Sequence, residues 1–267
     1  EKNSQGSATK NNMFNGKNGY LDGRYREYEV REASWSTLTS NVTESVQQYN
    51  DAAIMVITRD GSEDGDTWFP TNECFDNTYL DLSTEEADVL SNLKLLKDQG
   101  KLKKIIVVLN TKMVMQMANL TKEQYGVDAC LFPGVNGVSA YKSLSEILCG
   151  EVSPSGHLAD VMAYDTDSAP ATVNTGYFKW TQSNGLPATD LGVYNDFYLS
   201  YSEGIYVGYR YFETRYEDFV LNNGRKANST AGVKNSQNDW KYQEEVAFPF
   251  GFGESYSNFE YSNYKVT

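Results

Sequence analysis

Three short apolar runs rich in β-branched residues occur in the first half of the chain and predict three β-strands. Residues 52–59 read AAIMVITR, residues 104–110 read KIIVVLN, and residues 129–132 read ACLF. Each run is bounded by polar or glycine-containing segments, which is typical of strands buried inside a sheet. We expect the three runs to be neighbouring parallel strands of one sheet.

Between these runs the apolar positions recur with helical spacing. Residues 84–98 carry one apolar face, and Gly100 follows where a helix is expected to end. Ser83 and Glu86 have the spacing of a capping box, in which each side chain accepts a hydrogen bond from a backbone amide of the first turn. The apolar positions of this helix are Val89, Leu90, Leu93 and Leu96.

Shorter helices are predicted at residues 36–49 and 136–148, and a further strand is expected after the turn at Gly156. Strands that alternate with helices at this spacing predict an α/β fold. The sheet is expected to be mainly parallel and covered by helices on both faces, which makes it an α/β sandwich.

The two ends of the chain show a different pattern. Residues 1–36 are polar and contain scattered glycines, so they predict a loop-rich lead-in. Residues 194–216 are dense in tyrosine, and we expect this aromatic-rich C-terminal segment to pack through its rings with hydroxyls at the surface, with a sugar-binding platform as the alternative. We therefore divide the chain into the lead-in, 1–36, and one α/β-sandwich domain, 37–260.

Composition narrows the class of function. The formal net charge of −13 over 267 residues disfavours nucleic-acid backbones and anionic membrane surfaces as partners. No apolar run approaches the length of about 18 residues that a membrane span requires. The first residues lack the apolar core of a signal peptide, and the sequence leaves the compartment open, including secretion or the cell surface. Three cysteines without metal-ligand spacing and a single histidine predict neither a zinc site nor a disulfide framework, and no cofactor is expected.

An acidic loop follows the first predicted strand at once, with Asp60, Glu63, Asp64 and Asp66 inside seven positions. Catalytic groups gather at the carboxyl ends of strands in α/β sheets. A carboxylic acid among other carboxylates has a raised pKa, because its ionisation adds like charge to a confined site. That property suits a general acid near neutral pH. The alternative is a solvated acidic loop or a cation site.

A glycine-containing loop, PGVNG at residues 133–137, lies between the third strand and its helix. Strand, glycine loop and helix is also the shape of a phosphate cradle. The loop lacks G-x-G-x-x-G and the G-K-[ST] ending of a P-loop, so close packing of helix on strand is favoured. A flavodoxin-like nucleotide-binding protein, based on residues 134–137, remains a weaker alternative.

Six motifs in sequence carry a resemblance to a known family. They read ITRDGSEDGD, YLDLSTEEADVL, KKIIVVLN, FPGVNGVSA followed by EILCGEVSPSGHL, YSEGIYVGYRYFETR, and FPFGFGESYSNF. In this order, over roughly residues 45–260, they resemble the second, α/β-sandwich domain of glycoside hydrolase family 3, the β-glucosidases and their relatives. Two positions depart from the family pattern: His157 stands where lysine is common, and ADV at 159–161 replaces a proline-containing strand start.

The resemblance implies roles for five residues of the acidic loop. Glu63 matches the family's loop glutamate, the general acid/base. Asp64 stands where glycine is common, which leaves a shift of the assignment by one residue open, and Asp66 matches an aspartate that shapes the loop and raises the pKa of Glu63. Trp68 and Phe69 are candidates for lining the leaving-group sugar, with loop anchoring as the alternative.

The resemblance also implies that half of an active site lies elsewhere. Retaining glycosidases use two carboxylates about 5–5.5 Å apart, and in this family the nucleophilic aspartate belongs to a separate (β/α)8 barrel domain. Such a barrel needs about 250 residues, and this chain shows no such run. Asp239, in Asn238-Asp239-Trp240, resembles the nucleophile motif but lies inside the α/β pattern, and we interpret it as a coincidence.

The expected function is therefore the acid/base-bearing domain of a retaining, exo-acting β-glycosidase of the β-glucosidase type. Its partners would be an oligosaccharide or β-glucoside substrate and a barrel on another segment or chain. The alternative is a non-catalytic carbohydrate-binding or structural module that retains the fold.

Overall fold

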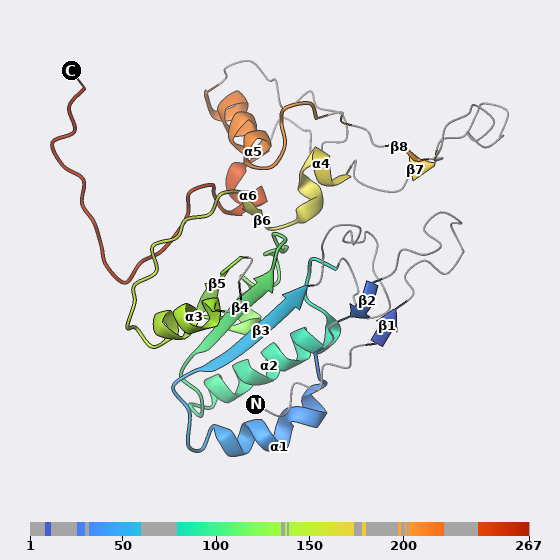
Figure 1. Cartoon of the computed structure of the whole chain (residues 1–267), viewed down its shortest axis with the longest axis vertical. Helices are drawn as coiled ribbons and strands as arrows, with labels where there is room; N and C mark the ends of the chain where they lie inside the picture. Colours follow the sequence, from blue (N-terminus) through green and yellow to red (C-terminus); the bar gives the residue numbers. More distant parts are fainter. Residues whose placement is uncertain are drawn as a thin grey trace.

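The computed structural model describes most of the chain, and its centre is one parallel sheet (Figure 1). The described residues are 9–11, 26–29, 32–59, 79–134, 137, 139–173, 178–179, 197–198, 201, 203–221 and 240–266. The elements of the central unit are α1 (Trp35–Ser45), β3 (Ala53–Arg59), α2 (Thr84–Asp98), β4 (Ile105–Thr111), η1 (Glu123–Tyr125), β5 (Ala129–Leu131) and α3 (Ala140–Leu148).

The three predicted strands are neighbours in the order β3-β4-β5, and both pairings are parallel. The β3–β4 register runs from Ala53 opposite Ile105 to Arg59 opposite Thr111. The carboxyl ends of β3 and β4 therefore meet at the same edge of the sheet. The prediction of a mainly parallel sheet with helices is confirmed.

Helix α2 covers one face of this sheet, and α1 lies beside α2 (Figure 1). The capping box predicted from Ser83 and Glu86 is present and starts α2. The apolar face of α2 is buried against alternate residues of β3 and β4, as the period of two in a strand requires. The residues of this contact include Met55, Ile57, Val89, Leu90, Leu93, Leu96, Ile105, Val107 and Leu109.

The opposite face of the sheet is covered less completely. Ile54 and Val56 on β3 are 50% and 51% exposed, whereas Val108 on β4 is buried. Helix α3 begins at Ala140 rather than at 136. Gly137 lies outside the helix, and glycine is a poor helix former.

A second group of elements lies beyond the carboxyl ends of β3 and β4 (Figure 1). The strand expected after Gly156 is only two residues long, and it pairs antiparallel with a strand from the end of the chain instead of joining the parallel sheet. These elements are β6 (Met162–Ala163), η2 (Thr166–Ser168), α4 (Pro170–Val173), α5 (Tyr209–Tyr216), η4 (Glu217–Leu221), α6 (Tyr242–Glu245) and β9 (Val246–Phe248).

The core of this second group combines small aliphatic side chains with the aromatic rings of Tyr211 and Phe212. Arg215 is fully buried, its guanidinium lies 4.6 Å from the ring centre of Trp240, and it donates a hydrogen bond to the hydroxyl of Tyr211 at 2.6 Å. Burial raises the pKa of Tyr211 to about 12. The expected ring packing of the tyrosine-rich segment is therefore found at Tyr211, but its hydroxyl is buried against Arg215 and not at the surface, while Tyr201 is exposed.

Two further antiparallel pairs are β1 (Thr9–Asn11) with β2 (Arg26–Glu29), and β7 (Phe178–Lys179) with β8 (Phe197–Tyr198). The division into a lead-in and one sandwich domain stays a prediction. Among the described residues, no helix combines the length and the apolar character that crossing a membrane would require.

Asp128 fastens the amino-terminal edge of the sheet. Its carboxylate accepts hydrogen bonds from Lys97 on α2 at 2.7 Å, from Lys104 at 3.1 Å, and from the backbone amide of Ile105 at 2.8 Å. Burial acts to raise the pKa of Asp128, but these three donors outweigh it and hold the pKa at about 2.

We expect the Asp128→Asn variant to lose stability in a pH-dependent way. Because the folded-state pKa is lowered, the contribution of the carboxylate is fully present above its unfolded pKa of about 4 and disappears as the pH falls through about 2. Because water screens this partly exposed site, urea unfolding should show the variant only about 1 kcal/mol less stable than wild type at pH 7, with the two converging near pH 2. A difference that does not depend on pH would contradict this.

Candidate functional site

The candidate site lies at the carboxyl edge of β3, where the acidic loop begins directly after Arg59. Residues 60–78 lie outside the described residues, and with them all five site residues predicted from the sequence. Those residues are Glu63, Asp64, Asp66, Trp68 and Phe69. The structure does describe both ends of this loop, Arg59 at its start and Tyr79 at its finish.

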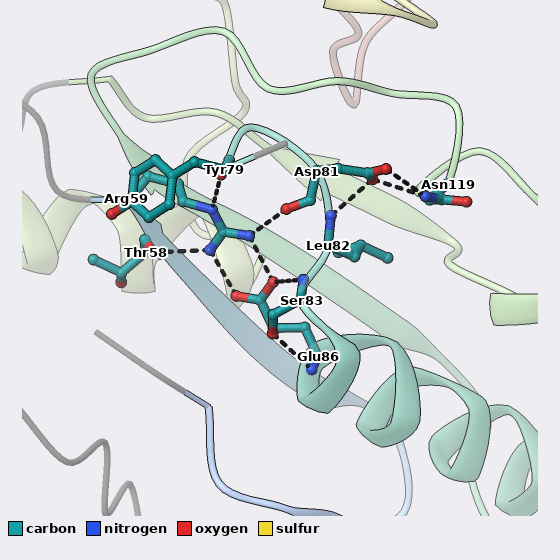
Figure 2. Close-up of polar contacts among 8 residues, drawn as sticks. All are labelled: Thr58, Arg59, Tyr79, Asp81, Leu82, Ser83, Glu86 and Asn119. Carbon is teal, nitrogen blue, oxygen red and sulfur yellow. Dashed lines mark hydrogen bonds and ion pairs between the residues drawn. The ribbon is translucent and has the colours of Figure 1, made fainter. Parts of the chain in front are cut away.

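Arg59 joins the two ends of the loop (Figure 2). Its side chain is buried, its Nε donates to the carbonyl oxygen of Tyr79 at 2.6 Å, and its Nη2 donates to the carbonyl oxygen of Asp81 at 2.5 Å. The guanidinium also lies 5.5 Å from the ring centre of Tyr79. One side chain at the end of β3 thus holds the backbone that returns from the loop.

Glu86 balances the charge of Arg59. Its two carboxylate oxygens accept from the two terminal nitrogens of Arg59 at 2.7 and 2.6 Å, which is a bidentate pair. The side chains are 1% and 6% exposed, so the pair is screened little by water.

The same carboxylate also begins α2. Oε2 of Glu86 accepts from the amide of Ser83 at 2.8 Å, and the hydroxyl of Ser83 accepts from the amide of Glu86 at 3.1 Å. The end of β3, the return of the loop and the first turn of α2 are therefore fixed by one cluster of contacts (Figure 2). We call Arg59, Glu86, Ser83 and the carbonyls of Tyr79 and Asp81 the loop clamp.

Asp81 connects the loop clamp to the segment after β4. Its carboxylate accepts from the side-chain amide of Asn119 at 2.8 and 2.7 Å, from Gln116 at 3.1 Å, and from the amide of Leu82 at 2.7 Å. The backbone amide of Gln116 in turn donates to the carbonyl of Leu80 at 2.9 Å. The returning end of the loop is therefore bound on two sides.

These contacts determine whether the carboxylates near the loop clamp are available for proton transfer. Glu86 and Asp81 are buried and engaged with donors on both oxygens, so neither is suited to exchange protons with a substrate. Among the described residues, no group of histidine, cysteine, aspartate and glutamate could hold a metal ion. The assignment of the acid/base to the acidic loop stays a prediction from the sequence.

The loop clamp is absent from the features that the sequence predicts. A signal for it was present, because Arg59 continues the alternation of Met55 and Ile57 and so falls on the buried face of β3. A buried arginine requires a counter-charge. Its partner, Glu86, had been assigned only a capping role.

The glycine loop offers no added support for phosphate binding. Gly134 has a φ of +69°, a backbone conformation that glycine adopts without strain, so the turn itself explains the residue. Val135 and Asn136 lie outside the described residues. The nucleotide-binding alternative stays untested, and so does Asp239, which is also outside the described part of the chain.

A cavity of about 400 Å³ lies between α5 and the turn after β9. Its aromatic rings pack on each other, with Tyr209 and Phe250 stacked at 4.4 Å, and Glu213 accepts a hydrogen bond from the hydroxyl of Tyr242 at 2.5 Å. The lining residues are Ile205, Tyr206, Tyr209, Arg210, Glu213, Thr214, Pro249 and Phe250. The lining residues include one carboxylate, Glu213, so the cavity does not hold a pair of catalytic carboxylates.

Comparison with known proteins gives the same family that the sequence motifs resemble. Residues 6–209 match the family described as the glycosyl hydrolase family 3 C-terminal domain. A β-glucosidase of Ruminococcus albus is 27% identical over 225 residues, which cover 84% of this chain and 18% of that protein. An exo-α-(1→6)-L-arabinopyranosidase of Bifidobacterium longum is 25% identical over 195 residues, covering 73% of this chain and 19% of that protein.

Among solved structures, a β-glucosidase from Paenibacillus barengoltzii aligns with 86% of this chain at a TM-score of 0.56 and 23% identity, and the match spans 19% of that protein. At this identity the likeness supports the fold alone. The chain thus spans less than one fifth of the length of these relatives.

We expect variants of the loop clamp to separate its two structural roles. Ser83→Ala removes one cap hydrogen bond and should cost about 1 kcal/mol of unfolding free energy. Glu86→Ala leaves the buried Arg59 without a counter-charge and should cost about 3–5 kcal/mol. Urea unfolding measures both, and Asp98→Asn, which removes the exposed Lys94–Asp98 pair on the same helix, should stay within about 0.5 kcal/mol of wild type. Equal losses for Ser83→Ala and Glu86→Ala would mean that the ion pair contributes nothing beyond the cap.

Proposed function

Because this chain belongs to glycoside hydrolase family 3, through its match to the family's C-terminal domain, we propose that it supplies the acid/base carboxylate of a retaining, exo-acting β-glycosidase. Glu63 is the proposed acid/base. The observation that carries this proposal is the loop clamp, which fixes both ends of the loop containing Glu63 at the carboxyl edge of a parallel sheet.

In this mechanism Glu63 acts twice. It first protonates the leaving glycosidic oxygen while a nucleophilic carboxylate attacks the anomeric carbon, and it then deprotonates the water that releases the sugar from the glycosyl-enzyme. Asp66 and Asp64 add like charge beside Glu63, which favours its protonated form at the start of the reaction. Trp68 and Phe69 would present ring faces to the leaving-group sugar.

The nucleophile is proposed to lie on a (β/α)8 barrel domain outside this chain. Support comes from length, because the chain corresponds to less than one fifth of the relatives that it matches. We propose terminal β-linked sugars, glucosides first, as substrates, since several of the related proteins are named β-glucosidases. The arabinopyranosidase relatives make the choice of sugar the finer part of the proposal.

The isolated 267-residue chain should show no turnover of aryl β-glucosides, because it supplies only one of the two required carboxylates. The measurement is release of nitrophenol, with the chain joined to its barrel domain as the positive control. Robust hydrolysis by the isolated chain would overturn the proposal and require a nucleophile inside it, with Asp239 the first to be tested.

In the complete enzyme, Glu63→Ala should lose activity in proportion to the need of the leaving group for a proton. Natural disaccharides should be cleaved about 10²–10⁴-fold more slowly, whereas glycosylation by activated aryl glycosides should suffer far less. Azide needs no general base, so it should restore turnover of the activated substrates by attacking the glycosyl-enzyme.

Asp64→Asn and Asp66→Asn are the matched controls for a collapsed loop. Equal losses on good and poor leaving groups, without azide rescue, would show that Glu63 is not the acid/base. Rescue of an Asp64→Ala variant instead would move the assignment by one residue.

A further inference from the structure

We propose that the cavity between α5 and the turn after β9 binds a neutral sugar ring, a pyranose that is either free or at the end of an oligosaccharide. The cavity has a volume of about 400 Å³, and small-molecule sites occupy about 300–1,000 Å³. Its lining includes no residue of the acidic loop, so the site can be tested separately from the proposed role of Glu63.

One wall of the cavity is polar and comes from α5. Arg210, Glu213 and Thr214 are spaced at i, i+3 and i+4, which places them on one side of the helix. The guanidinium of Arg210 lies 5.5 Å from the ring centre of Tyr209 and, among the described residues, makes no hydrogen bond or ion pair. One oxygen of Glu213 accepts from the hydroxyl of Tyr242 at 2.5 Å, and within the described part of the chain its other oxygen accepts none. This wall therefore keeps both donors and an acceptor for a ligand.

The rest of the lining is mainly apolar. Pro249 and Phe250 come from the turn after β9, and Ile205 and Tyr206 come from the segment before α5. The ring of Phe250 stacks on Tyr209 with 4.4 Å between the ring centres, yet Phe250 stays 49% exposed and Ile205 stays 73% exposed. Large apolar side chains that remain exposed beside a cavity are typical of ligand sites.

Both walls are attached to one short segment before β6. The carboxylate of Asp160 accepts from the amide of Tyr209, the first residue of α5, at 2.7 Å. The amide of Gly251 donates to the carbonyl of Leu158 at 2.8 Å, and the amide of Leu158 donates to the carbonyl of Phe252 at 2.8 Å. Because the walls share one support, the cavity is formed before a ligand arrives, and binding does not have to order it.

The two kinds of lining match the two sides of a pyranose. A sugar ring has a face of C–H groups that packs on apolar side chains and an edge of hydroxyls that both donate and accept. Arg210 donates to such hydroxyls and Glu213 accepts from them. An anionic ligand would meet the carboxylate of Glu213 in a chain of net charge −13, and a wholly apolar ligand would bury both charged groups without partners.

The experiment titrates the 267-residue chain with methyl β-glucoside and with cellobiose, and saturation-transfer NMR measures the Kd. We expect saturable binding with a Kd of about 1 mM, which is ordinary for a ligand with so few atoms. Phe250→Ala removes the exposed ring, and Arg210→Met removes the donors but keeps an apolar stem. Each should weaken binding about tenfold. Phe259→Ala is the matched control, because it removes a 75% exposed ring that does not line the cavity, and its Kd should equal that of wild type.

The class of ligand is tested with glucuronate and phenol beside the neutral glucoside. Glucuronate should bind about tenfold more weakly than methyl β-glucoside, and Glu213→Gln, which keeps an acceptor for Tyr242, should narrow that difference. Tighter binding of glucuronate would make the cavity an anion site at Arg210 and would overturn the assignment to a neutral sugar. Binding of phenol without binding of the glucoside would overturn it as well.

The variants also locate the bound sugar. Binding that is lost in Trp68→Ala but kept in Phe250→Ala and Arg210→Met would assign the sugar to the acidic loop and overturn the inference, and so would the absence of any saturable binding. Arg210, Phe250 and Ile205 are exposed, so their replacement should leave urea unfolding close to wild type. If Phe250→Ala fails to fold, Ile205→Ser and Arg210→Met decide by the same titration.

The outcomes are separable from those for the proposed function. Weakened sugar binding in Phe250→Ala and Arg210→Met, together with failure of azide rescue in Glu63→Ala, would keep this site and remove Glu63 as the acid/base. Azide rescue together with unchanged binding in the cavity variants would keep the acid/base and remove this site.

Discussion

The buried pair between Arg59 and Glu86 is the interaction on which the candidate site depends. Two charges taken out of water are costly unless each is paired and hydrogen-bonded. Here both are, since the guanidinium reaches two carbonyls and the carboxylate also accepts from the amide of Ser83. An arrangement with so many simultaneous partners tolerates little displacement, and this gives the carboxyl edge of β3 a defined geometry.

The two edges of the parallel sheet are fastened in different ways. At the amino-terminal edge, Asp128 gathers two lysines and one amide at a partly exposed position. At the carboxyl edge, the pair is buried and the chain departs into the acidic loop. The first arrangement stabilises the sheet, and the second also joins the two ends of the acidic loop, Arg59 and Tyr79.

The sequence predicts the elements around the site well, because they carry strong local signals. β3, β4 and α2 have long apolar runs or a complete capping box, and each appears within one residue of its expected bounds. The length and pairing of the short strand β6 could not be predicted in the same way, since they depend on β9, more than eighty positions away in the chain. Pairing over such a separation leaves no periodic signal near either strand.

The ion pair escaped prediction for a related reason. Arg59 and Glu86 are 27 residues apart, and the local pattern at Glu86 is already explained by the cap of α2. The five candidate residues of the acidic loop remain predictions, since their support is a motif and the position of that motif after β3.

The double role of Glu86 narrows which amino acids can occupy its position. A capping box accepts glutamine as well as glutamate, because either side chain can receive the amide hydrogen bond. A buried guanidinium accepts only a carboxylate as its counter-charge, and aspartate is one methylene too short to meet both partners from this turn of the helix. Only glutamate therefore meets both requirements, so position 86 should tolerate fewer substitutions than either requirement alone would allow.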